Sequence, residues 1–194
     1  MTKNTFLLFL FVAIFTWTSC NTKSKYDQMV EEGLASGEHY DSLFLGISLG
    51  MTDSAFYTHC WQLNKQQLVY QGSGNMSVLY KLKEELKHAA TMEFYPEFVA
   101  GKIAKMKAII KYDGWSPWNE DMSNNELQED VLQLFKNWYG DDFMEVKHPH
   151  NGVAYVKIQG NRRISIYVND DTSVVVFFTD LAMESDLDTQ ELQD

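Results

Sequence analysis

The stretch "LFLGISLGMTDSAF", residues 43–56, contains Gly46-x-Ser48-x-Gly50 between an apolar run and a predicted helix. This spacing is typical of the nucleophile elbow of serine esterases, where a sharp turn from strand to helix exposes the serine hydroxyl. In an elbow the helix starts almost at once, whereas here the first helix-capping residue is Thr52. Both glycines also suit a simple turn, because glycine tolerates backbone angles that other residues avoid. We therefore favour a turn and expect no catalytic residue.

Cys60 stands between His59 and Trp61, an arrangement that raises the question of a thiolate with its base. Neighbours in a helix point about 100° apart, so the thiol and the imidazole do not face each other. Phe56, Cys60 and Leu63 follow a helical period instead. We expect Cys60 to be a small buried residue.

The "HPH" segment offers His148 and His150 at a spacing that places two imidazoles on one side of an extended chain. Glu145 or Asp142 would help such a pair to bind zinc or copper. A third ligand is not defined, so we favour exposed loop histidines and expect no metal and no other cofactor.

Aromatic side chains cluster in "YDGWSPWN", where Trp115 and Trp118 flank Pro117 and Tyr112 precedes them. Exposed aromatics on a stiff turn can stack on sugar rings or anchor a protein partner. The alternative is that both indoles close the hydrophobic core. Tyr112, Trp115 and Trp118 are our candidates for binding a partner or ligand.

Two further features bear on chemistry. Arg162 and Arg163 could pair with an anionic ligand, although charges beside a strand are more often solvated. The sequence contains no phosphate-binding loop, CxxC pair, HExxH helix or dinucleotide fingerprint.

The first residues have the features of an export signal. Lys3 supplies a positive charge, residues 6–15 form an apolar run, and Ser19 precedes Cys20. This pattern resembles a bacterial lipoprotein signal, although Trp17 stands where that signal usually has Leu. The resemblance implies cleavage after residue 19 and lipid on the Cys20 sulfur, which would tether the chain to a membrane. The alternative is an ordinary cleaved signal.

The composition excludes several classes of partner. The 194 residues include 45% hydrophobic residues, enough for a real core. Acidic residues outnumber basic ones and give a net charge of −11. This charge argues against nucleic acid and against direct attraction to anionic lipid.

Periodicity predicts the elements. A helix follows Thr52, and a second helix lies between the Ser123 capping box and Gly140. Alternation predicts strands at 78–82, 92–94 and 104–112, with Pro96 and Gly101 bounding a turn. Residues 78–90 fit a helix as well. Four more strands are expected at 143–147, 153–158, 163–168 and 173–179.

The predicted fold class is α+β, with two tandem units, each a helix followed by an antiparallel β-meander, in one compact body. The expected divisions are a signal peptide (1–19), a tether (20–42), a first unit (43–118), a second unit (119–180) and an acidic tail (181–194). The lipoprotein signal, the "GMT" helix entry and the element order over residues 43–180 resemble small envelope lipoproteins. These include the β-lactamase-inhibitor-protein type and the small lipoprotein of the outer-membrane β-barrel assembly machine.

The resemblance implies a lipid-anchored protein of the bacterial cell envelope, in the periplasm or at the outer membrane. We expect a non-catalytic protein-binding or assembly module that uses a sheet face or the Trp115–Trp118 loop to bind another envelope protein. The alternatives are a surface glycan-binding lipoprotein and, with less support, a serine esterase that uses Ser48.

Overall fold

The computed structural model describes residues 23–73, 76–148 and 152–184 of the chain. The expected signal peptide and Cys20 lie outside the described residues. The elements in chain order are α2 (Lys25–Ala35), α3 (Asp53–Lys65), β1 (Val69–Gln71), β2 (Val78–Leu82), β3 (Ala90–Val99), β4 (Lys102–Tyr112), the 3-10 helix η2 (Glu120–Met122), α4 (Asn124–Tyr139), β5 (Met144–His148), β6 (Gly152–Gln159), β7 (Arg162–Asp170) and β8 (Ser173–Asp180).

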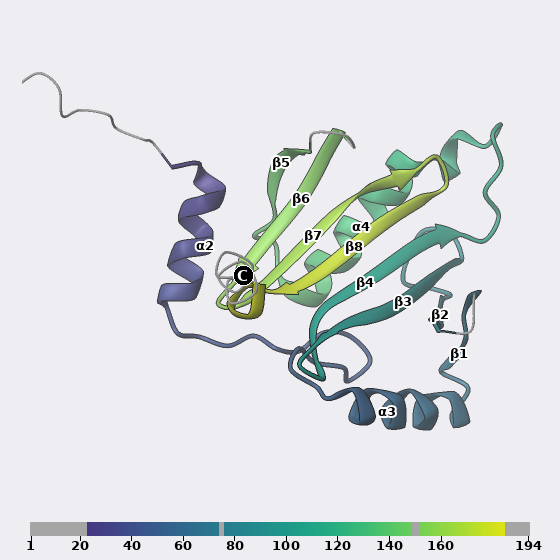
Figure 1. Ribbon diagram of the computed structural model, residues 1–194. Helices are drawn as coiled ribbons and strands as arrows, with labels where there is room; N and C mark the ends of the chain where they lie inside the picture. Colours follow the sequence, from purple (N-terminus) through teal and green to yellow (C-terminus); the bar gives the residue numbers. More distant parts are fainter. Residues whose placement is uncertain (1–22, 74–75, 149–151, 185–194) are drawn as a thin grey trace, which may run out of the picture.

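The eight strands form a single antiparallel sheet in the order β1-β2-β3-β4-β8-β7-β6-β5 (Figure 1). The predicted fold class of two tandem helix-plus-meander units is therefore wrong. β4 and β8 pair directly, with a register that runs from Lys105↔Thr179 to Ile110↔Val174. Without this pairing, β4 and β8 would each be an edge strand with a row of unpaired backbone N–H and C=O groups. Pairing them hydrogen-bonds these groups to each other.

Two capped helices contribute apolar side chains to the hydrophobic core, α4 against β7 and β8 and α3 beside β1. The Thr52 hydroxyl accepts a hydrogen bond from the backbone N–H of Ala55 at 3.3 Å and starts α3. Ser123 accepts one from Glu126 at 3.4 Å and starts α4, and Gly140 ends it with a φ of 91°. Both predicted helices are thus confirmed. Their buried apolar residues are Phe56, Cys60 and Leu63 in α3, and Leu127, Val131, Leu132, Leu134 and Phe135 in α4.

The alternation predicted for β4 is confirmed, because Met106, Ala108 and Ile110 are fully buried while Lys107 and Lys111 are exposed. The same period extends through β8, where Val174, Val176 and Phe178 point to this core.

The first strands differ from the prediction in two places. Residues 78–90 fitted either a strand or a helix. In the structure, residues 78–82 form the strand β2 and residues 83–89 are irregular. Pro96 lies inside β3, opposite Met106, and does not bound the turn. A proline fits there because β2 pairs only as far as Phe94, and within the described residues no strand pairs with Pro96 on that side. The turn is made by Ala100 and Gly101, both with positive φ.

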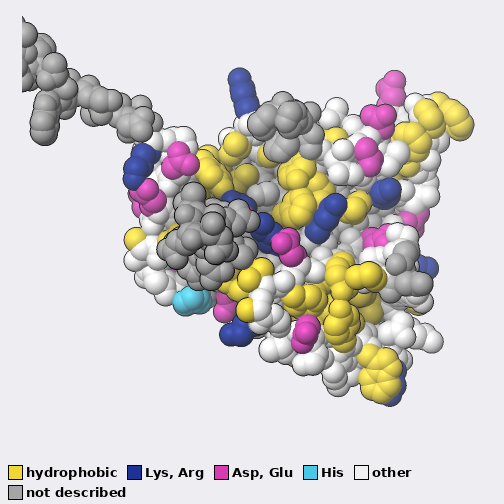
Figure 2. Space-filling model, in the orientation of Figure 1, with side chains coloured by type: hydrophobic (Ala, Val, Ile, Leu, Met, Phe, Trp, Pro, Cys, Tyr) yellow, Lys and Arg dark blue, Asp and Glu magenta, His cyan; other side chains and the backbone are white. Residues whose placement is uncertain are grey.

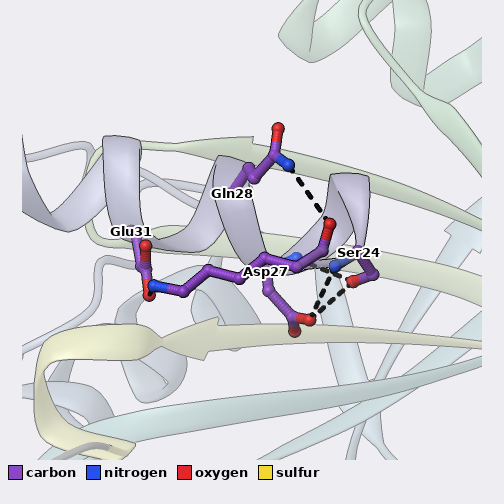
Figure 3. Close-up of polar contacts among 5 residues, drawn as sticks. Ser24, Asp27, Gln28 and Glu31 are labelled. Carbon is purple, nitrogen blue, oxygen red and sulfur yellow. Dashed lines mark hydrogen bonds and ion pairs between the residues drawn. The ribbon is translucent and has the colours of Figure 1, made fainter. Parts of the chain in front are cut away.

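Residues 23–42, expected to belong to a tether, include the helix α2. Its first turn is closed by a capping box, in which the Ser24 hydroxyl and backbone bond with Asp27 (Figure 3). The Gln28 side chain donates to the backbone carbonyl of Lys23 at 3.1 Å. Figure 3 draws the bond from Gln28 as a dashed line. The helix packs on β6 and on the turn that follows it, where a Cβ at Gly33 would meet the Gly160 carbonyl oxygen at 2.8 Å.

The beginning of the expected acidic tail is folded. Leu181 is buried, and its backbone N–H donates to the Asn161 carbonyl at 2.7 Å. Residues 185–194 lie outside the described part of the chain. Of the helices in the described ranges, none combines the length and the apolar character that a membrane span requires.

Candidate functional site

Ser48 does not occupy a nucleophile elbow. The chain turns at Phe44–Ile47, where the Ile47 N–H donates to the Phe44 carbonyl at 3.0 Å, and Ser48 then bridges to Ser42. Helix α3 begins only at Asp53, and the sheet is antiparallel. Among the described residues, no hydrogen bond joins the Ser48 hydroxyl to a histidine. The turn interpretation is confirmed.

His59 and Cys60 are separated as the helical spacing predicted. The His59 ring bonds through Nε2 to the Leu45 carbonyl at 2.7 Å, which fixes the turn that precedes Ser48. Cys60 is buried, and this burial raises the pKa of its thiol to about 11. The imidazole therefore holds a loop, and the thiol belongs to the core.

The His148–His150 segment, for which we favoured exposed loop histidines over a metal site, lies largely outside the described residues. The backbone of His148 ends β5, but its side chain and all of His150 lie outside the described residues. Within the ranges that the structure describes, no three His, Cys, Asp or Glu side chains gather as a metal site would require.

The three aromatic candidates occupy three different environments. Tyr112 is buried, and its hydroxyl donates to the Asp130 carboxylate at 2.6 Å. Burial and Asp130 together raise the pKa of Tyr112 well above its usual range. Trp115 is half-buried, whereas the Trp118 side chain is 85% exposed. Trp118 is thus the only one of the three that presents a largely free ring.

The turn that carries Trp118 is closed by a hydrogen bond from the Asn119 N–H to the Ser116 carbonyl at 3.0 Å. Pro117 stands at the second position of this turn, where its fixed φ is favoured. The turn belongs to the connection between β4 and α4, which projects at a corner of the molecule (Figure 1). The indole is therefore held on a short rigid turn.

The second face of the sheet, opposite the one that α4 covers, is mixed in character. The rings of Tyr167 and Phe177 stack there with centroids 6.1 Å apart, and Lys107 lies over Phe177. Figure 2 shows hydrophobic side chains over the middle of the sheet, interspersed with charged ones. At one side, Glu184 pairs with Arg163 at 3.0 Å and Lys105 at 3.5 Å. Part of this face is therefore already engaged by the chain itself.

The two adjacent arginines point to opposite faces of β7. Arg163 lies on the second face, where it also donates to the Tyr26 hydroxyl of α2 at 2.7 Å. Arg162 is buried on the face that carries α4 and lines a cavity of about 570 Å³. Both arginines were candidates for pairing with an anion, but no pattern in the sequence indicates this cavity, which lies beside the segment 40–45 and the end of α4.

The sequence matches no protein-family model, and neither the curated proteins nor the solved structures give a match. The resemblance to small envelope lipoproteins therefore stays a prediction from the sequence.

Proposed function

We propose that this protein is a non-catalytic binding module of the bacterial envelope, held at a membrane through lipid on Cys20. We also propose that Trp118 anchors a protein partner. The observation that carries this proposal is the 85% exposure of an indole on a turn closed by its own hydrogen bond. Burying such a ring, which covers 150–250 Å², would contribute about 3–5 kcal/mol before the costs of association.

The residues around the turn suggest the chemistry of the partner. Asp113, Glu120 and Asp121 are exposed and flank the turn on both sides. A complementary surface would have an apolar pocket for the indole and a rim of Lys or Arg. Large aromatic side chains that fill a pocket near the centre of an interface are among the few residues that carry most of the binding energy.

A protein partner is favoured over a glycan because the two tryptophans differ in exposure. Stacking on a sugar chain would use both indoles as platforms, yet Trp115 is half-buried and only Trp118 is largely free. A single protruding ring suits insertion into a pocket better than it suits a flat platform.

The test is crosslinking and affinity capture of the full chain from native membranes. Trp118→Ala is compared with wild type and with Trp61→Ala, a matched control on α3 whose indole is 59% exposed. We expect one stoichiometric protein from wild type and Trp61→Ala, with recovery from Trp118→Ala at least tenfold lower. Equal recovery from both variants would contradict the proposal, as would the absence of a stoichiometric protein.

The lipid anchor is tested separately by Cys20→Ala. We expect this variant to lose the acyl mass at residue 20 and to leave the membrane fraction. An unmodified Cys20 in the wild-type protein would contradict the anchor and would leave the Trp118 experiment valid on its own.

A further inference from the structure

The cavity beside Arg162 has an apolar body and a polar end. Its volume of about 570 Å³ falls within the range of small-molecule sites. Leu43, Leu45 and Met92 provide apolar lining, and Arg162 and Gln159 lie at the polar end. Tyr40 and Trp138 also line it, and each is 38% exposed, so the cavity is accessible from solvent on their side.

The guanidinium of Arg162 is almost completely buried, because the residue is only 5% exposed. Its Nη1 donates to the Ser42 carbonyl, and its Nη2 donates to the Gln159 amide oxygen at 2.7 Å. Its central carbon lies 4.9 Å from the centroid of the Tyr139 ring. All of these partners are uncharged, so they orient the cation without neutralising it.

Among the described residues, no carboxylate oxygen lies within 4.0 Å of the Arg162 guanidinium. Asp180 stands opposite Arg162 in the β7–β8 register, and Asp41 bonds to Asn161 at 2.9 Å, yet neither forms an ion pair with Arg162. The other buried cation on this face, Lys157, does have a carboxylate partner, Asp142, at 3.4 Å. Burial lowers the pKa of Arg162, and the charge of Asp41 opposes this shift without making a direct ion pair. A buried charge without a direct ionic contact is unusual, since desolvation is normally offset by pairing.

Two buried polar atoms beside the cavity also lack a hydrogen-bond partner in the described part of the chain. They are Nε of Arg162 and the hydroxyl of Tyr139. Both residues line the cavity. A buried donor without an acceptor is destabilising, and both atoms have almost no accessible surface, so a ligand oxygen reaches them only when the side chains around them shift.

We propose that this cavity binds a small organic carboxylate with an apolar body. The carboxylate accepts hydrogen bonds from Arg162 and the Tyr139 hydroxyl, and the apolar part packs on Leu43, Leu45 and Met92. A guanidinium held by neutral groups keeps its charge for the ligand, and charge-assisted bonds to a carboxylate are the strong class of hydrogen bond. The site is independent of the proposed role of Trp118.

The test is a calorimetric titration of the full chain in lipid nanodiscs, with empty nanodiscs as the reference. The probes are octanoate, the uncharged octanamide, and acetate, which lacks the apolar body. We expect saturable 1:1 binding of octanoate, with a Kd at least tenfold lower than that of octanamide or acetate. Octanoate that shows no saturable heat, or binds no better than octanamide, would overturn the proposal.

Three variants locate the carboxylate. Arg162→Gln removes the charge and is expected to raise the octanoate Kd at least tenfold, while Tyr139→Phe removes one hydroxyl and is expected to raise it at least fivefold. Arg163→Gln is the matched control, because it lies next in β7 with its side chain on the opposite face, and its Kd is expected to stay at the wild-type value.

Tyr139→Phe keeps the test decisive if Arg162→Gln fails to fold. The Tyr139 hydroxyl has no hydrogen bond within the described residues, so its removal breaks none there. An octanoate Kd that is the same in Tyr139→Phe as in wild type would refute the placement of the carboxylate between these two groups.

Discussion

Replacing Asp130 by alanine is expected to destabilise the fold strongly, because this carboxylate joins three parts of the chain. Asp130 belongs to α4 and is 7% exposed. It accepts hydrogen bonds from the Tyr112 hydroxyl of β4 at 2.6 Å and from the Lys87 backbone N–H at 3.1 Å, and it also pairs with the exposed Lys87 amine at 3.4 Å. Lys87 lies in the irregular segment between β2 and β3, so Asp130 ties that segment and β4 to the helix.

The magnitude follows from the number and type of these bonds. Each hydrogen bond to a charged group contributes about 1.5–3 kcal/mol, part of which is offset by the desolvation of the Asp130 carboxylate. Its removal also leaves the buried Tyr112 hydroxyl without its acceptor. We therefore expect Asp130→Ala to lower the free energy of unfolding by about 3 kcal/mol and the Tm by roughly 6–12 °C. Tyr112→Phe is expected to lower it by about 1.5 kcal/mol.

The assay is urea unfolding of both single variants and the double variant, analysed as a double-mutant cycle. The coupling energy between Asp130 and Tyr112 is expected to be about 1.5 kcal/mol. Glu126→Ala is the control, because Glu126 lies in the same helix and pairs with the exposed amine of Lys87 at 3.1 Å. Its effect is expected to stay below about 0.5 kcal/mol. A coupling energy below about 0.5 kcal/mol would refute the reasoning.

Three shorter predictions concern backbone, thiol and pH. Gly160→Ala is expected to lower the free energy of unfolding by at least about 3 kcal/mol, because its Cβ would lie 2.1 Å from the Glu38 carbonyl oxygen. Gly50 has a similar positive φ but open space around it, so Gly50→Ala is expected to lower the free energy of unfolding by only about 1 kcal/mol. Urea unfolding of both variants measures the difference. With its pKa raised to about 11, Cys60 is expected to react with a disulfide reagent at pH 8 about a hundredfold more slowly than after unfolding, and equal rates would contradict its burial. Burial opposes ionisation of Asp170, but hydrogen bonds from Thr172 and Ser173 outweigh it and lower its pKa to about 2, below the unfolded value of about 3.9. The ionised carboxylate therefore stabilises the wild-type fold above pH 4, and this stabilisation is lost as the pH falls toward 2. Asp170→Asn is expected to remove this stabilisation, which is measured by unfolding wild type and variant in parallel across this pH range.

Local features of the fold were predictable because their causes are local. The capping serine, the apolar spacing and Gly140 all lie within or beside α4, and they define its two ends. The sheet is different. The pairing of Ile110 with Val174 joins residues more than sixty positions apart, and alternation within each strand does not say which strand becomes its neighbour. That is why the sequence indicated strands and two units, whereas the chain forms one sheet.

The candidate residues likewise divide into features set by local sequence pattern, which were predictable, and features set by distant contacts, which were not. Tyr112 continues the alternation of Met106, Ala108 and Ile110, so the pattern itself indicated that Tyr112 is buried and poorly placed for a surface site. The period of two in a strand likewise sends Arg162 and Arg163 to opposite faces. The burial of Arg162 could not be predicted, because it depends on the Ser42 carbonyl, which approaches from 120 positions away in the sequence.

The two proposed sites lie at opposite ends of α4 and are expected to act independently. Trp118 precedes the helix and Tyr139 ends it, and a helix of 16 residues is about 24 Å long. Coupling over that distance requires an element with two arrangements, whereas α4 is capped at both ends and packs closely on β7 and β8. Trp118→Ala is therefore expected to leave the octanoate Kd within about twofold of wild type, and Trp138→Ala, which removes lining from the cavity, is expected to raise it in the same titration. A fivefold change caused by Trp118→Ala would mean that α4 transmits between the two ends and that the loop and the cavity form one functional unit.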